Sequence, residues 1–403
     1  MNVLHAIPAI ADRYGGPSRV VLGMCRALQE RGVNPLIATT DADGAGRLAV
    51  ETGRPISYEG SQVIFFRRQF SEAFKYSRPL HRWLESNVAR FDLVQIHAVF
   101  SHSSLAAARA CLRQRVPYVV RPLGSLDCWS LTRKRLRKRL LWHLGVAEMV
   151  GNAAAMHYTS AEERRQSEIA VGSTPSVVIP LAVDDQLLNA KVARGEFRRR
   201  YPPIGDQPYV LALGRIHPVK GLELLLDSFL DAAREEEFKR WRLVIAGDGD
   251  AKYVENLKRR VQQRGSADRV LFTGWLEGAK KLEALRDAAL FALPSLHENF
   301  GLSVAEALAF GVPVLISSSV GLAGHVESAA AGWVAELDRT SFRASLVEAL
   351  REDGERSIRG AAARRLAESS FTWSAVSSQL IRFYEWSAGR RDSHEVVTTC
   401  SAT

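Results

Sequence analysis

The chain has few cysteines and no cysteine pattern typical of a metal site. Its 403 residues include only Cys25, Cys111, Cys128 and Cys400. These lack both the CxxC pair and the Cys/His spacing that hold zinc. Scattered single cysteines fit a reducing compartment better than a secreted disulfide framework. We therefore expect a cytoplasmic protein with free thiols.

Other sequence signals are also missing. No segment is long enough and sufficiently free of charge to span a bilayer. Residues 1–8 lack the basic start and cleavage site of a signal peptide, so we expect a strand there. No helix-turn-helix, RNP or zinc-finger pattern is visible. These absences argue against an integral membrane protein, a secreted protein and a nucleic-acid-binding protein.

The chain nevertheless carries a formal net charge of +10. An excess of this size points to an anionic partner, either a phosphorylated substrate or an anionic membrane face, with nucleic acid the least favoured choice. Apolar residues make up 46% of the sequence, enough for two cores, and a chain of this length usually forms two domains.

Short apolar runs alternate with helical patterns along the whole chain. In the first half the runs cover 36–39, 63–66, 93–97, 118–120, 157–159 and 177–179. This alternation predicts an α/β fold with parallel, doubly wound sheets. A break falls between 180 and 208, where 201–205 has a linker-like composition. We expect domains at 1–185 and 186–371, with a polar, disordered tail at 388–403.

Two loops of the second half have the chemistry of a diphosphate site. An apolar strand at 290–293 stops at Pro294, and a helix at 303–310 follows a loop that contains Glu298. Such a loop opens onto a helix N-terminus at the carboxyl end of a strand, where backbone amides bind anions. Glu306 lies within that helix. The region therefore combines two carboxylates, which can bind sugar hydroxyls, with backbone amides, which can bind phosphates. The alternative is an amphipathic helix with two surface acids.

The second loop follows the strand that begins at residue 209. It contains Gly214-Arg215 and Lys220-Gly221 and leads into an apolar helix. Arginine offers a planar fork of donors and lysine a compact charge, and both suit a diphosphate. The alternative is surface charge at the ends of a strand and a helix.

The stretch Glu298-Asn299-Phe300-Gly301, continued by Glu306 and by 311–314 (Gly-Val-Pro-Val), resembles the retaining GT-B glycosyltransferases of family 4, or group 1. The resemblance implies two Rossmann-like domains facing across a cleft, with a C-terminal helix at about 372–387 crossing back to the first. It implies transfer of a sugar from a UDP- or GDP-sugar to a glycan or lipid-linked acceptor, without a cofactor or metal. Polysaccharide or lipopolysaccharide biosynthesis is the expected setting.

The resemblance also assigns site residues. The catalytic positions it implies are Glu298, Arg215, Lys220 and His97. The donor-binding positions it implies are Gly15, Gly16, Gly214, Gly274, Trp275, Asn299, Phe300, Gly301, Leu302 and Glu306. Four of these have structural alternatives: a tight turn for the paired glycines Gly15 and Gly16, a structural role for His97 and core packing for Trp275.

The sequence gives weaker indications of the residues that would bind the acceptor. Asp127 is a candidate acceptor contact, whereas Leu123 stands where many relatives of the family have histidine. Leu136, Leu140 and Leu144 recur at helical spacing among cations within 132–144, a basic amphipathic helix. This helix could lie on the anionic inner face of the plasma membrane or steer a lipid-linked acceptor. The alternatives are a solvated helix face packed on its own domain and a chance likeness to a nuclear-localisation signal. A GT-B epimerase, a hydrolase and a non-catalytic partner subunit remain alternative functions.

Overall fold

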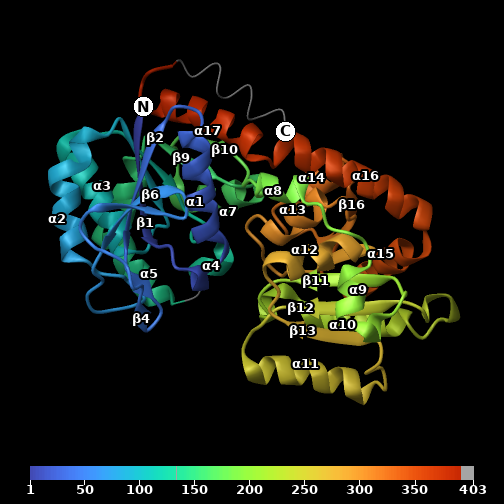
Figure 1. The fold of residues 1–403 in the computed structure, drawn as a ribbon. Coiled ribbons are helices and arrows are strands. Elements are labelled where there is room, and N and C mark those ends of the chain that lie inside the picture. The colour runs from blue at the N-terminus through green and yellow to red at the C-terminus, as the bar shows by residue number, and fades with distance from the viewer. Residues whose placement is uncertain (133, 392–403) are drawn as a thin grey trace. The chain divides into compact units, whose positions relative to one another are not determined.

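The chain forms two compact units in the computed structural model, which describes residues 1–132 and 134–391 (Figure 1). Unit 1 contains Met1–Ala182 and the C-terminal segment from Trp373, and unit 2 contains Val183–Thr372. The chain therefore passes from one unit to the other slightly earlier than expected from the sequence. Each unit is a doubly wound α/β fold, as predicted.

Unit 1 is built on one eight-stranded sheet in the order β10-β9-β8-β7-β1-β2-β6-β5. All neighbours are parallel except β5, which pairs antiparallel with β6. Its strands are β1 (Asn2–Ala9), β2 (Asn34–Thr40), β5 (Pro55–Tyr58), β6 (Ser61–Phe66), β7 (Leu93–His97), β8 (Tyr118–Arg121), β9 (Ala155–Tyr158) and β10 (Ser176–Val178). A separate small hairpin is formed by β3 (Ala42–Asp43) and β4 (Gly46–Arg47).

Helices cover this sheet, and the last helix of the chain is one of them. The α-helices are α1 (Gly16–Gln29), α2 (Arg78–Asn87), α3 (His102–Gln114), α4 (Cys128–Thr132), α5 (Arg135–Leu141), α6 (Ala147–Gly151), α7 (Ala161–Val171) and α17 (Trp373–Ser387). α17 returns to unit 1 and packs along α1, where a Cβ on Gly23 would lie 2.6 Å from the Trp373 ring. Close approach of the two helices thus requires glycine at position 23.

The chain after α17 departs from the expected tail. Residues 388–391 continue as a turn, in which the Ala388 amide donates to the Tyr384 carbonyl and Arg390 pairs with Asp92 at 2.6 Å. The ordered chain is therefore longer than the sequence predicted. The rest of the predicted tail, 392–403, lies outside the described residues.

Unit 2 has a six-stranded sheet in the order β13-β12-β11-β14-β15-β16, and all neighbours are parallel. Its strands are β11 (Tyr209–Leu213), β12 (Arg242–Ala246), β13 (Val270–Gly274), β14 (Leu290–Leu293), β15 (Val314–Ser317) and β16 (Gly332–Ala335). Its helices are α8 (Asp185–Asn189), α9 (Glu196–Arg200), α10 (Leu222–Ala232), α11 (Ala251–Gln263), α12 (Gly278–Asp287), α13 (Leu302–Ala309), α14 (Ala323–Ser328), α15 (Arg339–Arg351) and α16 (Asp353–Ser370).

The segment predicted to link the domains belongs to unit 2 instead. Phe197 is fully buried and Ile204 is 2% exposed, so the chain around Tyr201 packs into this unit. The prediction of a linker at 201–205 was wrong, because proline and glycine there form a short 3₁₀ turn (Pro202–Ile204) that ends at Gly205.

Candidate functional site

The sheet of unit 2 reverses its winding between β11 and β14. These strands are hydrogen-bonded neighbours, with Val210 opposite Leu290. The connections that leave them run to opposite sides of the sheet order, toward β12 and toward β15. The carboxyl ends of two such strands form the crevice where open α/β sheets bind ligands. Both loops that the sequence singled out begin there.

The two loops are joined to each other. The Leu296 amide donates to the Val219 carbonyl at 2.8 Å. The Lys220 ammonium forms an ion pair with the Glu298 carboxylate, and both side chains are about four-fifths buried. The structure therefore brings together two predicted site residues that are far apart in the sequence, and it shows them paired with each other.

Gly221 allows the loops to approach this closely. Its φ is +64°, and a Cβ there would lie 2.0 Å from the Pro294 carbonyl oxygen. Any other residue would be strained and would push the loops apart. A similar contact occurs on the other side of β11, where a Cβ on Gly247 would lie 1.8 Å from the Gly214 carbonyl oxygen.

Two sources of donors at this crevice are open. Arg215 is exposed and has no hydrogen-bond or ion-pair partner among the described residues. α13 begins after Gly301, whose φ is +100°, and no side chain caps it. The first backbone amides of a helix lack intrahelical acceptors, so they remain available to an anion. The arrangement thus offers a guanidinium and backbone amides as donors to an anion.

The second acid of the site, Glu306, is also paired. Its carboxylate lies 2.6 Å from the Lys281 ammonium of α12, and the two side chains are only 12% and 15% exposed. Sequence reasoning missed Lys281. Nothing in its local pattern marks it, since it is one of two adjacent lysines at the start of a helix.

The neighbouring residues of the predicted donor site differ in exposure. Trp275 follows β13 and is 50% exposed, which rules out the alternative that it packs in the core. Phe300 is 2% exposed and contacts Phe371 edge-on, so its side chain is a core anchor and only its backbone can reach a ligand. Asn299 and Leu302 are partly buried. Gly274 ends β13 with a φ of +73°.

In unit 1 the corresponding reversal lies between β1 and β7. Gly15, with φ +74°, connects a 3₁₀ turn to the start of α1, and Gly16 is the first residue of that helix. The space around Gly15 is open, because nothing lies within 4 Å of a Cβ there. The paired glycines thus present backbone at the carboxyl end of β1.

His97 ends β7 but points into the interior. It is fully buried, and its Nε2 lies 3.2 Å from Nδ1 of His5, with the two rings stacked. Burial, together with His5 and Arg121, holds the pKa of His97 well below its usual range, so the ring is neutral at pH 7. The imidazole has no exposed surface in this structure, and its contact with a donor sugar stays a prediction.

His97 is part of a buried polar cluster that the sequence did not reveal. His157 lies 2.9 Å from the Gln95 amide and 3.2 Å from the Ile179 carbonyl. Burial lowers the pKa of His5 and that of His157 to about 3. The fully buried Arg121 has its pKa lowered to about 10 by burial. The sequence does not show that these polar side chains face the interior. Each lies in an otherwise apolar strand, and the local pattern does not reveal which partners it meets on neighbouring strands.

Asp127, the predicted acceptor contact, is fully buried and caps α4. Its Oδ1 accepts a hydrogen bond from the Ser130 amide at 2.6 Å. The loop before it is held by Glu163, which accepts from the Gly124 amide at 2.8 Å. An acceptor role for Asp127 stays a prediction.

The basic segment is helical and exposed. Residue 133 lies outside the described part of the chain, and α5 continues into a π-helical turn (Trp142–Val146). No residue of α5 is buried, and Leu136, Leu140 and Leu144 are between 55% and 85% exposed. Leu141 and Trp142, by contrast, are partly buried and pack against the core of unit 1. The helix therefore packs on its own domain with its leucine stripe in solvent, so a solvated helix face stays an alternative to a membrane contact.

The described part of the chain has neither a cluster of metal ligands nor a membrane-spanning helix. Across 1–132 and 134–391, no three or more His, Cys, Asp or Glu side chains form a group that could hold a metal ion. No helix within the same residues is long and apolar enough to cross a membrane.

Known families match both halves of the chain. Residues 193–366 match the model of glycosyl transferases group 1, and residues 15–182 match that of the glycosyl transferase 4-like domain. A phosphatidyl-myo-inositol mannosyltransferase of Mycobacterium leprae is 30% identical over 96% of this chain and 96% of that relative. A mannosylfructose-phosphate synthase of Agrobacterium fabrum is 27% identical over 75% of this chain and 70% of that protein.

Solved structures with the same fold are more distant in sequence. The Anabaena protein HepE in complex with UDP has a TM-score of 0.75 at 18% identity, covering 96% of this chain and all of that chain. A sucrose-phosphate synthase from Thermosynechococcus elongatus has a TM-score of 0.72 at 20% identity, covering 96% and 98% of the two chains.

Proposed function

Because the chain belongs to the glycosyl transferases of group 1, we propose that it transfers a sugar from a nucleoside-diphosphate sugar to an acceptor hydroxyl, with retention of configuration at the anomeric carbon. The observation that carries the proposal is the pair of joined loops at the switch point of unit 2, where Arg215 and the start of α13 offer free donors. Phosphate groups are the ligands that such donors bind best.

The diphosphate is the leaving group, and its stabilisation is the main task of the site. Arg215, Lys220 and the first amides of α13 would bind the charge that grows on the leaving oxygen. Preorganised donors of this kind typically contribute a few kcal/mol each. Since Arg215 and the first amides of α13 offer donors to the diphosphate, with Lys220 beside them, we propose that the reaction needs neither a metal nor a cofactor.

The acids and Trp275 would bind the rest of the donor. Glu306 would hold the ribose hydroxyls, oriented by Lys281 at 2.6 Å. The exposed face of Trp275 offers a stacking surface to the nucleobase. Glu298 would fix the hydroxyls of the transferred sugar and stabilise positive charge on its ring.

In the bond-changing step, the acceptor oxygen bonds to the anomeric carbon as the bond from that carbon to the diphosphate breaks. We propose that both occur on one face of the sugar, so configuration is retained. The proton of the acceptor hydroxyl passes to an oxygen of the departing diphosphate. No protein nucleophile is needed in this scheme.

The acceptor would be a glycan or a lipid-linked sugar at the cytoplasmic face of a membrane. The exposed leucines of α5 stand among cations, an arrangement that suits an anionic bilayer surface. The Mycobacterium leprae relative is named for a phosphatidylinositol acceptor, which supports a lipid-bound acceptor here. Biosynthesis of a polysaccharide or of lipopolysaccharide is the setting we propose.

Thermal stabilisation by UDP, GDP and ADP, each without metal, tests the donor site. One nucleotide should raise the Tm of the wild type, and Arg215→Ala should abolish that shift. Arg234→Ala, which removes another exposed arginine of unit 2, should retain it. No shift with any nucleotide at millimolar concentration would refute the donor site and favour a non-catalytic subunit.

Product analysis with the matching sugar nucleotide then separates the remaining activities. A transferase forms a glycoside only when an acceptor is present. Release of free sugar or an isomerised sugar nucleotide without an acceptor would instead identify a hydrolase or an epimerase.

A further inference from the structure

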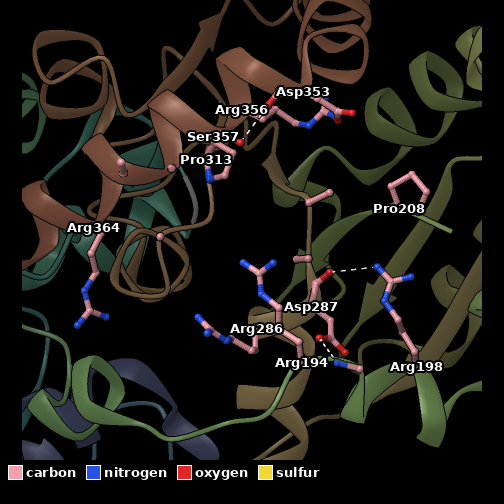
Figure 2. Close-up of a pocket in the computed structure, with 16 residues that line it drawn as sticks. Arg194, Arg198, Pro208, Arg286, Asp287, Pro313, Asp353, Arg356, Ser357 and Arg364 are labelled. Carbon is pink, nitrogen blue, oxygen red and sulfur yellow. Dashed lines mark hydrogen bonds and ion pairs between the residues drawn. The ribbon is translucent and has the colours of Figure 1, made fainter. Parts of the chain in front are cut away.

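A cavity of about 620 Å³ opens in unit 2, and Figure 2 shows the residues that line it. Its wall includes Pro208, Ala289 and Pro313, which directly precede β11, β14 and β15. It therefore lies at the amino ends of the strands whose carboxyl ends carry the donor site. A ligand in this cavity cannot touch Arg215 or Lys220, neither of which lines it.

The lining of this cavity is strongly cationic. It contains the five arginines Arg194, Arg198, Arg286, Arg356 and Arg364, several of which Figure 2 shows around the cavity. Only two acids, Asp287 and Asp353, line it. The cavity thus carries a net formal charge of +3, from five arginines and two aspartates.

Three of the arginines hold the walls together. Arg198 donates to the Gly205 carbonyl at 3.1 Å, Arg356 to the Leu350 carbonyl at 2.9 Å, and Arg364 to the Leu188 carbonyl at 2.7 Å. A carbonyl satisfies the hydrogen bond of a guanidinium without neutralising its charge. Arg356 is also ion-paired with Asp353, and Arg364 with Glu368 at 2.6 Å. Of these three side chains, Arg198 therefore contributes most to the positive field of the cavity.

The two acids are already engaged. Asp287 accepts hydrogen bonds from the Gly195 amide at 2.7 Å and from the Phe197 amide at 3.1 Å. Asp353 forms an ion pair with Arg356. Arg194 and Arg286 are left exposed, with no hydrogen-bond or ion-pair partner in the part of the chain that the structure describes.

We propose that this cavity binds a phosphorylated small molecule through Arg194 and Arg286. Guanidinium groups match the geometry of phosphate oxygens, with two parallel hydrogen bonds per group. The volume lies in the range of small-molecule sites and is concave. One wall is a face of α16 with Gly360 and Ala361. Glycine at position 360 lets this helix approach the Gly311 carbonyl, from which a Cβ would lie only 2.5 Å away. The site is separate from the donor site and does not depend on it.

Inorganic tripolyphosphate is the probe that tests the proposal. Because the donor loops also bind phosphates, the titrations use the full-length variant Arg215→Ala/Lys220→Ala, checked for folding by circular dichroism. By calorimetry this variant should bind one equivalent of the probe. Adding Arg194→Ala/Arg286→Ala should weaken that binding at least tenfold.

The matched control adds Arg234→Ala/Arg259→Ala instead, which removes the same charge from exposed positions outside the cavity. It should bind the probe within twofold of its parent. Equal losses in both variants would show only diffuse attraction to a basic surface and would overturn the proposal. Absence of binding in the parent, or full binding without Arg194 and Arg286, would overturn it too. Comparison of the wild type with the donor-loop variant reports on the donor site independently.

Discussion

Lys281 of α12 and Glu306 of α13 form an ion pair of 2.6 Å that is largely closed off from solvent. The pair fixes one carboxylate oxygen of Glu306, which leaves the other free to accept from a ligand. Lys281 therefore acts as a positioning residue for the acid that we assign to the ribose.

Lys281→Ala should raise the KM for the sugar nucleotide about tenfold, because Glu306 loses its orientation, while kcat changes less than threefold. Steady-state kinetics with the donor varied will measure this. Lys280→Ala, at an exposed neighbouring position, is the control and should behave like the wild type. Lys281→Arg should restore most of the affinity. A fall in kcat with unchanged KM would contradict the assignment.

We expect substitutions of Lys220 and of Glu298 to affect nucleotide binding and turnover differently. Lys220→Ala should lower kcat by roughly 100-fold or more and weaken nucleotide binding, because a donor to the leaving diphosphate is gone. Glu298→Gln should lower turnover to a similar degree and leave nucleotide affinity within threefold. Nucleotide titration and single-turnover kinetics distinguish these effects. Equal losses of nucleotide affinity in both variants would place Glu298 on the diphosphate instead.

Gly221 and Gly265 form a natural comparison, since both have a φ of +64°. Gly265→Ala adds a methyl group in open space and should cost only about 1 kcal/mol of backbone strain. Gly221→Ala also collides with the Pro294 carbonyl, so it should cost clearly more and should displace Lys220. Chemical denaturation and nucleotide binding will test this. Equal stability of the two variants would disprove the close approach.

Trp275→Ala should weaken nucleotide binding by roughly tenfold, as expected when one base loses an aromatic stacking surface. Trp275→Phe should retain most of the affinity, because a ring remains. Isothermal titration with the nucleotide that stabilises the wild type provides the measurement. If the alanine variant binds normally, Trp275 lies outside the base site.

The buried histidines predict a loss of stability at low pH. His5 and His157, with pKa values of about 3, and His97, also lowered by burial, stay neutral in the folded chain. In the unfolded chain they protonate near pH 6.5. Their contribution to the free energy of unfolding is therefore fully present above that pH and is lost as the pH falls below it. His5 and His157 should each cost about 1.4 kcal/mol at pH 5.5 relative to pH 7.5.

Denaturant unfolding at pH 7.5 and pH 5.5 measures this dependence. His157→Gln should reduce the difference between the two pH values by about 1.4 kcal/mol. His143→Gln, at an exposed position, is the control and should leave the difference intact. The same pH dependence in all three proteins would show that His157 does not contribute.

The sequence by itself determined the elements and the loops of the donor site. Leu290–Leu293 is a strand with the bounds that its apolar run predicts. The run ends at Pro294, a signal that lies directly beside the strand in the chain. The spacing of Glu298 and Glu306, and the pairing of Arg215 with a following Lys-Gly, likewise depend on local sequence alone.

The tertiary structure alone decided which side chains meet. Lys220 and Glu298 are 78 positions apart, and Lys281 and Glu306 are 25 apart. Their contacts depend on the order of strands in the sheet, which no local pattern records. The same holds for the burial of His97 against His5, which only the pairing of β1 with β7 creates. It holds as well for the basic cavity, whose arginines come from three helices and the turns beside them.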